Sequence, residues 1–231
     1  MAMNKEHFTS NYFSLCDLVG FDEQIINELK NESDFHKRNL ILAHIPKKYW
    51  KYNWDAISSD LGLNDYNHDG IEKISHYLNN VDEVFENGRG LYIYGGHGTS
   101  KTTTATIILR AVMDKLYTGY YLHFHELIDF TATVWKDDNK KWLWEHITQK
   151  IDFLVLDDIA RNFKMNEKES FVVDKLFVYR SNNNLPTILT TNLNTDDIGS
   201  LLGESILSIF KENVDEIQFV GEDVRGKCRQ K

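Results

Sequence analysis

Short apolar runs alternate with stretches of helical periodicity along most of the chain. Five runs predict β-strands, because each is four to eight residues long and is bounded by polar or glycine residues. They are LYIYG (91–95), GYYLHFH (119–125), FLVLDD (153–158), PTILTT (186–191) and DEIQFVG (215–221). Since helical patterns separate these strands, we expect an α/β fold, a parallel sheet flanked by helices on both faces.

Helical spacing of apolar residues also covers the start of the chain. FDEQIINELK (21–30) and FHKRNLILAHI (35–45) predict helices, and the pattern stops at Pro46. Between the strands, helices are predicted at about 101–116, 125–135, 140–149, 167–182 and 194–210. The chain therefore divides into a short helical N-terminal segment, residues 1–45, and a core, residues 46–231.

The segment LNDYNHDGIEKISHYL (63–78) partly imitates a calcium-binding loop. Asp65 and Asn67 fall at the first and third loop positions, but His76 stands where such a loop needs a glutamate with two oxygen ligands. We therefore interpret the segment as an Asx-rich turn that caps a helix beginning near Ile71.

Composition limits the kinds of protein and partner that fit. The chain has 231 residues and a net charge of −9, so any nucleic-acid contact must come from a local basic patch or from several subunits together. Cys16 and Cys228, its two cysteines, lie too far apart in sequence for a zinc motif or a disulfide framework. With no apolar run of about 18 residues and no signal-peptide core, we expect a cytoplasmic protein without a membrane partner.

The stretch GGHGTSKTTT (95–104) joins a predicted strand to a predicted helix, the context of the phosphate-binding loop G-x-x-x-x-G-K-[ST]. Backbone N–H groups of such a loop surround phosphates, Lys101 reaches the outer phosphates, and the Thr102 hydroxyl can ligate Mg²⁺. Ser100 replaces the motif's second glycine, and a left-handed backbone there would cost about 1–2 kcal/mol. The predicted nucleotide contacts are Gly95, Gly96, His97, Gly98, Thr99, Ser100, Lys101, Thr102 and Thr103. The alternative is a glycine-rich turn that has lost its ligand.

Two further strand ends carry polar side chains suited to a nucleotide site. FLVLDD follows the loop by about 50 residues and places Asp157 and Asp158 at the end of a central strand. We expect Asp157 to hold Mg²⁺ and Asp158, shorter than the usual glutamate, to orient an attacking water. Asn192, in TTNL (190–193), could lie between Asp157 and the terminal phosphate. Taken alone, it is more typical of a turn asparagine.

A set of motifs resembles the AAA+ ATPase core of DnaC-type helicase loaders, above all the short loaders carried by phages. In chain order they are GGHGTSKTT, LVLDDIA, YRSNNNLPTILTTNLN, LLGESILSIF and FVGEDVRGK. The resemblance covers about residues 45–225, and IstB-like transposition helpers share the same core. It implies a RecA-like P-loop sheet of the ASCE type that binds ATP and Mg²⁺. It also implies catalytic or sensing roles for Asp158, for Asn192 at the terminal phosphate, and for Arg225 as a second sensor.

The resemblance implies a function in DNA replication. Such proteins bind a replicative hexameric helicase of the DnaB type and deliver it onto single-stranded DNA, as homo-oligomers on the helicase. Residues 1–45 are then the candidate for docking the helicase, and the other interpretation is a helical wrap that completes the core. If the chain is phage-encoded, it would act in the host cytoplasm.

Departures from the family pattern concern ATP hydrolysis. The family has an arginine after the LGE stretch and, four residues later, an arginine finger, where this chain has Ser205 and Ile209. A finger of this kind is worth roughly 10³–10⁵ in rate in GTPases, so we expect a weak ATPase or none. Lys211 or Arg180 could substitute. Two other functions stay open: an adaptor or inhibitor of a helicase without turnover, and an IstB-like transposition helper.

Aromatic residues flanked by cations could contact single-stranded DNA. The segments VWKDDNKKWLW (134–144) and ARNFK (160–164) offer Trp135, Lys136, Lys140, Lys141, Trp142, Arg161, Phe163 and Lys164. Core packing is the other interpretation for the tryptophans.

Overall fold

The structure, a computed structural model, describes residues 23–62, 65–133, 138–159 and 164–221. Five strands form one sheet in the order β2–β3–β4–β1–β5, and every neighbouring pair is parallel. The strands are β1 (Gly90–Gly95), β2 (Gly119–His123), β3 (Phe153–Ile159), β4 (Thr187–Thr191) and β5 (Val214–Phe219). The predicted α/β fold with a parallel sheet is confirmed. Because β4 lies between β1 and β3, the carboxyl ends of these three strands meet at one edge of the sheet.

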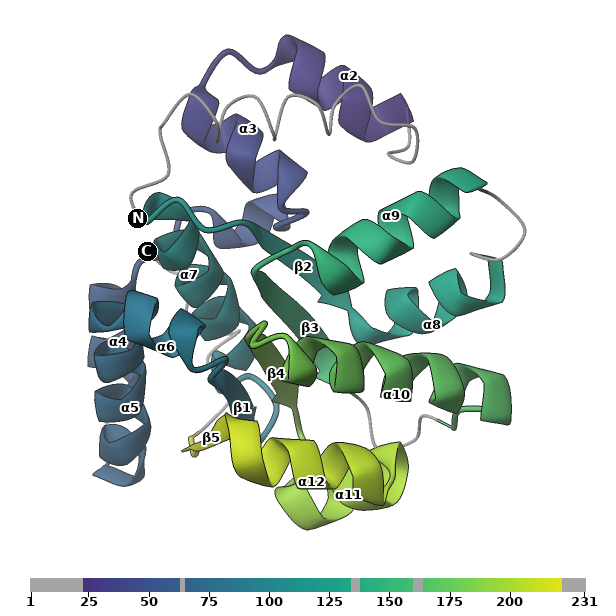
Figure 1. Cartoon of the computed structure of the whole chain (residues 1–231). Helices are drawn as coiled ribbons and strands as arrows, with labels where there is room; N and C mark the ends of the chain where they lie inside the picture. The colour runs from purple at the N-terminus through teal and green to yellow at the C-terminus, as the bar shows by residue number, and fades with distance from the viewer. Residues whose placement is uncertain (1–22, 63–64, 134–137, 160–163, 222–231) are drawn as a thin grey trace.

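Helices cover both faces of the sheet (Figure 1). The helices before β1, together with α7 directly after it, are α2 (Glu23–Asn31), α3 (Phe35–Leu42), η1 (Lys47–Tyr49), α4 (Trp54–Leu61), η2 (Asp65–Asn67), α5 (His68–Asn79), α6 (Val81–Glu86) and α7 (Lys101–Asp114). The helices that follow β2 in the chain are α8 (Phe124–Thr133), α9 (Asp138–Gln149), α10 (Glu167–Asn182), α11 (Thr195–Leu202) and α12 (Glu204–Asn213).

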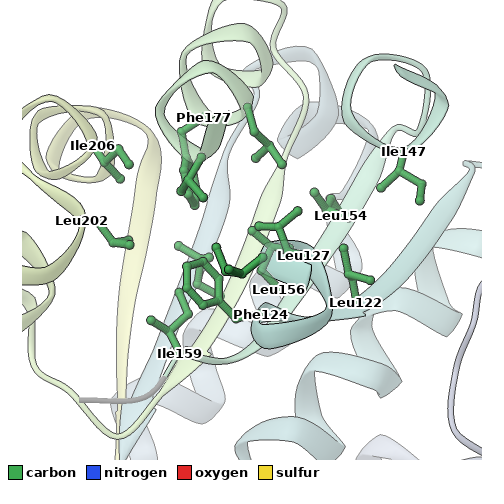
Figure 2. Packing of buried hydrophobic residues seen from close by; sticks show 14 of the residues in the cluster. Leu122, Phe124, Leu127, Ile147, Leu154, Leu156, Ile159, Phe177, Leu202 and Ile206 are labelled. Carbon is green, nitrogen blue, oxygen red and sulfur yellow. The ribbon is translucent and has the colours of Figure 1, made fainter. Parts of the chain in front are cut away.

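Two apolar clusters form the core because successive strand residues point to opposite faces. In β3, Phe153 and Val155 belong to the cluster that contains residues of α3 to α7. Leu154 and Leu156 belong to the other cluster, with residues of α8 to α12 (Figure 2). The continuous apolar run of β3 is thus buried on both sides, as expected for a central parallel strand. Asp157 follows on the α7 side of the strand.

The chain after α3 is attached to the edge of the sheet at β2. The main-chain N–H of Tyr121 donates to the carbonyl of Ala43 over 2.8 Å, and Nδ1 of His44 lies 3.2 Å from the carbonyl of Tyr121. Leu40, Ala43 and Ile45 are buried in the cluster on the α7 side. The end of α3 therefore packs as part of the core.

The segment 63–78 differs from its predicted structure. Helix α5 begins at His68, three residues before the predicted start, and Asn67 makes no capping hydrogen bond to it. The amide of Asn67 instead donates to the carbonyls of Leu61 and Val220, each over 2.9 Å, and its oxygen accepts the N–H of Val220 over 2.8 Å. The predicted Asx cap is therefore wrong, because this buried side chain ties the start of α5 to the end of β5. Helices α4 and α6 were not predicted.

Within the described parts of the chain, no helix combines the length and apolar character needed to cross a bilayer.

Candidate nucleotide site

The loop between β1 and α7 has the backbone of a phosphate-binding loop. Gly95 has a φ of 147° and Gly98 a φ of 72°, values that residues with a Cβ disfavour. A Cβ at Gly95 would lie 2.0 Å from the main-chain oxygen of Phe219 on β5. The geometry therefore requires glycine at Gly95 and favours it at Gly98. Beyond them, the N-terminal N–H groups of α7 have no partner within the helix and are available to an anion.

Ser100 has the left-handed backbone that its position in the motif suggested, with φ 65° and ψ 13°. Serine before a helix usually stabilises it by accepting an N–H bond, but the Ser100 side chain makes no capping hydrogen bond. The residue therefore carries the strain of a non-glycine side chain, about 1–2 kcal/mol, without a capping bond to offset it. The serine strains the loop but leaves the path of its backbone intact.

We expect Ser100→Gly to raise the free energy of unfolding by about 0.5–1 kcal/mol. Glycine removes the left-handed strain, and the greater freedom of the unfolded chain offsets part of that gain. Urea unfolding without nucleotide measures the difference. The matched control is Ser208→Gly, the same change at an exposed position inside α12, which should destabilise by roughly 0.5 kcal/mol. Equal destabilisation of both variants would contradict a strained Ser100.

The ammonium group of Lys101 lies inside the loop. Its Nζ donates to the carbonyls of Gly95 over 3.0 Å and Gly96 over 2.6 Å, and it lies 3.5 Å from the hydroxyl of Thr99. The hydroxyl of Thr99 itself donates to the carbonyl of Gly96 over 2.9 Å. Only 9% of Lys101 is exposed. The structure therefore places a buried positive charge at the centre of the loop, where it would meet a bound phosphate.

Thr102 and Asp157 meet beside the loop. The Thr102 hydroxyl, in the first turn of α7, donates to Oδ1 of Asp157 over 2.8 Å, and Asp157 is 1% exposed. A hydroxyl and a carboxylate are the hard oxygen ligands that Mg²⁺ prefers, usually together with waters and phosphate oxygens. The residues present therefore fit a magnesium ion bound with a nucleotide, and Thr102 and Asp157 would hold it.

Asp158 lies next to Asp157, in a less regular part of β3. The pairing of β3 with β4 shifts register between Leu156 and Ile159, and Asp158 has a φ of 61°. Its side chain is exposed, and its N–H donates to the hydroxyl of Thr190 over 3.0 Å. Strained residues of this kind cluster at functional sites, which agrees with a position open to water and substrate. The catalytic role of Asp158 stays a prediction.

Asn192 and His97 link the end of β4 to the loop. Nδ2 of Asn192 lies 3.3 Å from Nδ1 of His97, so the predicted sensor touches the predicted phosphate-binding loop. Thr103 follows Thr102 in the first turn of α7 and is half-buried. Arg225 lies outside the described residues. The structure thus brings together the predicted site residues of β1, α7, β3 and β4.

Two side chains at the site were not predicted. The Tyr121 hydroxyl donates to Oδ2 of Asp157 over 2.6 Å, and the Thr190 hydroxyl donates to Oδ1. Nδ1 of His123 lies 3.5 Å from the same Oδ2. The sequence did contain a signal for Tyr121 and His123, because residues two apart on a strand share a face.

Of the predicted DNA-contact residues that the structure describes, the tryptophan packs against other side chains, and two of the lysines are exposed. Trp142 is half-buried and stacks on His146, with ring centroids 5.0 Å apart. It also packs against the small apolar cluster of Leu29, Ile41 and Leu42 in α2 and α3. Core packing is therefore the correct interpretation for Trp142. Lys141 and Lys164 are exposed and Lys140 is half-buried, whereas Trp135, Lys136, Arg161 and Phe163 lie outside the described residues.

Arg180 is not a substitute arginine finger. It is 1% exposed, and its guanidinium donates to acceptors of its own chain, among them the carbonyls of Ile151, over 3.0 Å, and Pro186, over 2.8 Å. A side chain held in this way cannot reach the nucleotide of a neighbouring subunit. Ile209, at the usual finger position, is half-buried against the apolar cluster on the α10 side, while Lys211 is exposed on α12.

Comparison with known proteins finds similarity to proteins of DNA replication. No protein-family model matches the chain. Among curated proteins, the replicative helicase loader DnaI of Bacillus subtilis (strain 168) is 22% identical over 128 residues, which are 55% of this chain and 40% of DnaI. The chain thus spans less than half the length of this relative.

Solved structures resemble the chain over a longer stretch. A crystal structure of the DnaC helicase loader has a TM-score of 0.64 at 25% identity and covers 76% of this chain and 100% of its own. A structure of DnaI has a TM-score of 0.64 at 20% identity and covers 76% and 95%. The replication initiator DnaA, bound to AMPPCP and single-stranded DNA, has a TM-score of 0.62 at 16% identity and covers 75% and 51%.

The sheet order, the loop and the acid at the end of β3 define a P-loop domain of the AAA+ type. Within that class, the comparisons with DnaC and DnaI confirm the predicted resemblance to DnaC-type helicase loaders.

Proposed function

We propose that this protein is an ATP-binding loader that binds a replicative hexameric helicase of the DnaB type and delivers it onto single-stranded DNA. The observation that carries the proposal is the placement of Lys101 inside a glycine loop, beside the Thr102–Asp157 pair. Similarity to the DnaC and DnaI loaders supports the biological role. On this proposal the protein acts in the cytoplasm, as a homo-oligomer on the helicase.

The residues of the site have separate tasks. The N–H groups of the loop and the Lys101 ammonium bind the phosphates, and Asn192 senses the terminal phosphate from the end of β4. Thr102 and Asp157 hold Mg²⁺, which would neutralise charge on the phosphate oxygens when bound. Asp158 orients the attacking water. The likeness to DnaA, whose structure contains AMPPCP, supports nucleotide binding.

ATP acts mainly as a switch on this proposal. Ser205 is exposed and Ile209 is half-buried, so neither usual arginine position supplies a charge to a neighbouring nucleotide. Arg180 is fixed inside its own subunit. Without a finger, hydrolysis is slow, and binding alone orders the interface with the helicase. The lack of an arginine finger also favours one alternative, an adaptor that binds a helicase without hydrolysing ATP.

The N-terminal helices are the proposed docking element for the helicase. Helices α2 and α3 share a small apolar cluster of Leu29, Ile41 and Leu42, with Ile25 and Trp50 beside it. A groove of about 650 Å³ runs along α2 and is lined mainly by polar side chains, together with Ile41 and Trp50. The chain at the end of α3 bonds to β2, whereas the phosphate-binding loop follows β1, and β3 and β4 separate these two strands (Figure 1). We therefore expect a partner on α2 and α3 to leave the loop uncovered.

Co-purification with the cognate helicase tests the proposal. We expect the helicase to be retained with ATP and Mg²⁺ and to bind roughly 5- to 150-fold more weakly without nucleotide, the usual range of coupling between two sites. ATP turnover stimulated by single-stranded DNA would support loading. Helicase binding of equal strength with and without nucleotide, together with no ATP hydrolysis, would favour the adaptor. Failure to retain any hexameric helicase would overturn the loader assignment.

A further inference from the structure

The carboxylate of Asp157 is held by hydroxyl groups on both of its oxygens. Oδ1 accepts from Thr102 over 2.8 Å and from Thr190, while Oδ2 accepts from Tyr121 over 2.6 Å. Nδ1 of His123 is 3.5 Å from Oδ2 and makes no hydrogen bond, whereas Nε2 of the same ring lies 3.2 Å from the Tyr121 hydroxyl. Tyr121 is therefore the one hydrogen-bond donor to Oδ2 among the residues that the structure describes.

The ring of Tyr121 is fixed from several sides. Tyr121 is 1% exposed and pairs with Val155 of β3 in the sheet. On the other side of β2, its N–H donates to Ala43 and its carbonyl meets His44. The ring also contacts His123 edge-on, with centroids 5.4 Å apart. Since the main chain is held on both edges and the ring is buried, the hydroxyl has a defined position relative to Asp157.

The two oxygens of Asp157 therefore have different surroundings. Oδ1 faces Thr102, the other predicted Mg²⁺ ligand, so it is the oxygen placed to reach the metal directly or through water. Oδ2 is turned to Tyr121, and this bond fixes the plane of the carboxylate. Groups that orient a ligand in this way typically change metal affinity by about 10- to 100-fold when they are removed.

We propose that Tyr121 is a positioning residue that orients the carboxylate of Asp157 for Mg²⁺ in the nucleotide complex. The proposal rests on the proposed nucleotide site and adds to it a residue from β2, a strand outside the phosphate-binding motifs. Tyr121 acts through Asp157 and touches neither the metal nor the nucleotide.

The test is Tyr121→Phe, which removes the hydroxyl and keeps the buried ring. A fluorescent ATP analogue is titrated in EDTA and over a series of Mg²⁺ concentrations. In EDTA we expect affinity within about twofold of the unchanged protein. The Mg²⁺ concentration that gives half of the metal-dependent gain in affinity should rise roughly 10- to 100-fold. Circular dichroism melting establishes that the variant is folded at the temperature of the titration.

The matched control is Tyr117→Phe. Its hydroxyl donates to Asp82 over 2.7 Å, so this change also removes a tyrosine–carboxylate bond, but between α6 and the segment that joins α7 to β2. It should leave both titrations unchanged. An unaltered Mg²⁺ midpoint in Tyr121→Phe would overturn the positioning role, as would an equal loss of affinity in EDTA. A wild-type protein that binds no analogue at all would instead refute the nucleotide site.

Discussion

Arg180→Met is expected to lower the free energy of unfolding by about 3–5 kcal/mol, because several buried acceptors lose the donors of the guanidinium. Arg180 is 1% exposed, and all five N–H groups of its guanidinium have acceptors. These acceptors are the carbonyls of Thr148, Ile151, Asp152 and Pro186 and the hydroxyl of Thr187.

The size of the effect follows from what methionine leaves behind. It fills much of the same space, but the acceptors at the end of α9 and the start of β4 lose their bonds to the guanidinium. The carbonyl of Pro186 keeps the N–H of Leu154, 3.2 Å away, whereas each buried acceptor left without a partner costs about 1–3 kcal/mol. Burial already lowers the pKa of Arg180 to about 9, which shows how strongly this site disfavours an uncompensated charge. The guanidinium is nevertheless still protonated at pH 7.

Urea unfolding at pH 7, followed by tryptophan fluorescence, measures the loss. Lys168→Met is the control, because it removes an exposed cation from the same helix, α10, and should change stability by less than about 0.5 kcal/mol. Arg180→Lys, with three donors in place of five, should fall between the two. A loss below about 1 kcal/mol in Arg180→Met would show that the network contributes little to stability.

Lys101→Ala is expected to weaken ATP binding by roughly 10- to 150-fold, because a charge-assisted hydrogen bond contributes about 1.5–3 kcal/mol. The Lys101 ammonium is already inside the loop, on the carbonyls of Gly95 and Gly96. We expect it to exchange these neutral acceptors for phosphate oxygens when a nucleotide binds. Calorimetric titration with ATP and Mg²⁺ measures the affinity.

The control for this variant is Lys115→Ala, since Lys115 is exposed at the opposite end of α7. It should bind ATP as the unchanged protein does. If Lys101→Ala binds ATP equally well, the loop is not the phosphate site. Co-purification with the helicase distinguishes the two functions. If the protein is a loader, Lys101→Ala loses nucleotide-dependent retention of the helicase; if it is an adaptor, Lys101→Ala still retains the helicase.

The sequence predicted the sheet well because buried parallel strands are continuous apolar runs, and glycine, proline and acidic residues mark their ends. The motif raised the question of a left-handed backbone at Ser100, because glycine usually stands there, and the structure has that backbone. The start of α5 was misplaced because Asn67, which resembles a helix cap in sequence, bonds instead to Val220, 153 residues away. Local patterns carry no information about such a distant partner.

The pattern of residues along the chain also did not show which polar side chains are buried. Arg180 is one of the polar residues near the end of a helix, and nothing in its neighbours along the chain shows that β4 and α9 enclose it. Tyr121 belongs to an aromatic strand in which every ring is expected to pack. Its hydroxyl bond to Asp157 depends on the pairing of β2 with β3, which only the three-dimensional arrangement establishes.

The attachment of Ala43 and His44 to Tyr121 has a consequence for assembly, because β2 lies at one end of the strand order. While α3 stays in place, the outward N–H and carbonyl of Tyr121 are occupied, so the strand offers little to an incoming chain. A partner that draws α3 away would uncover these groups, and an unpaired edge readily accepts an extended peptide. Removal of the helices would thus create a place for strand addition.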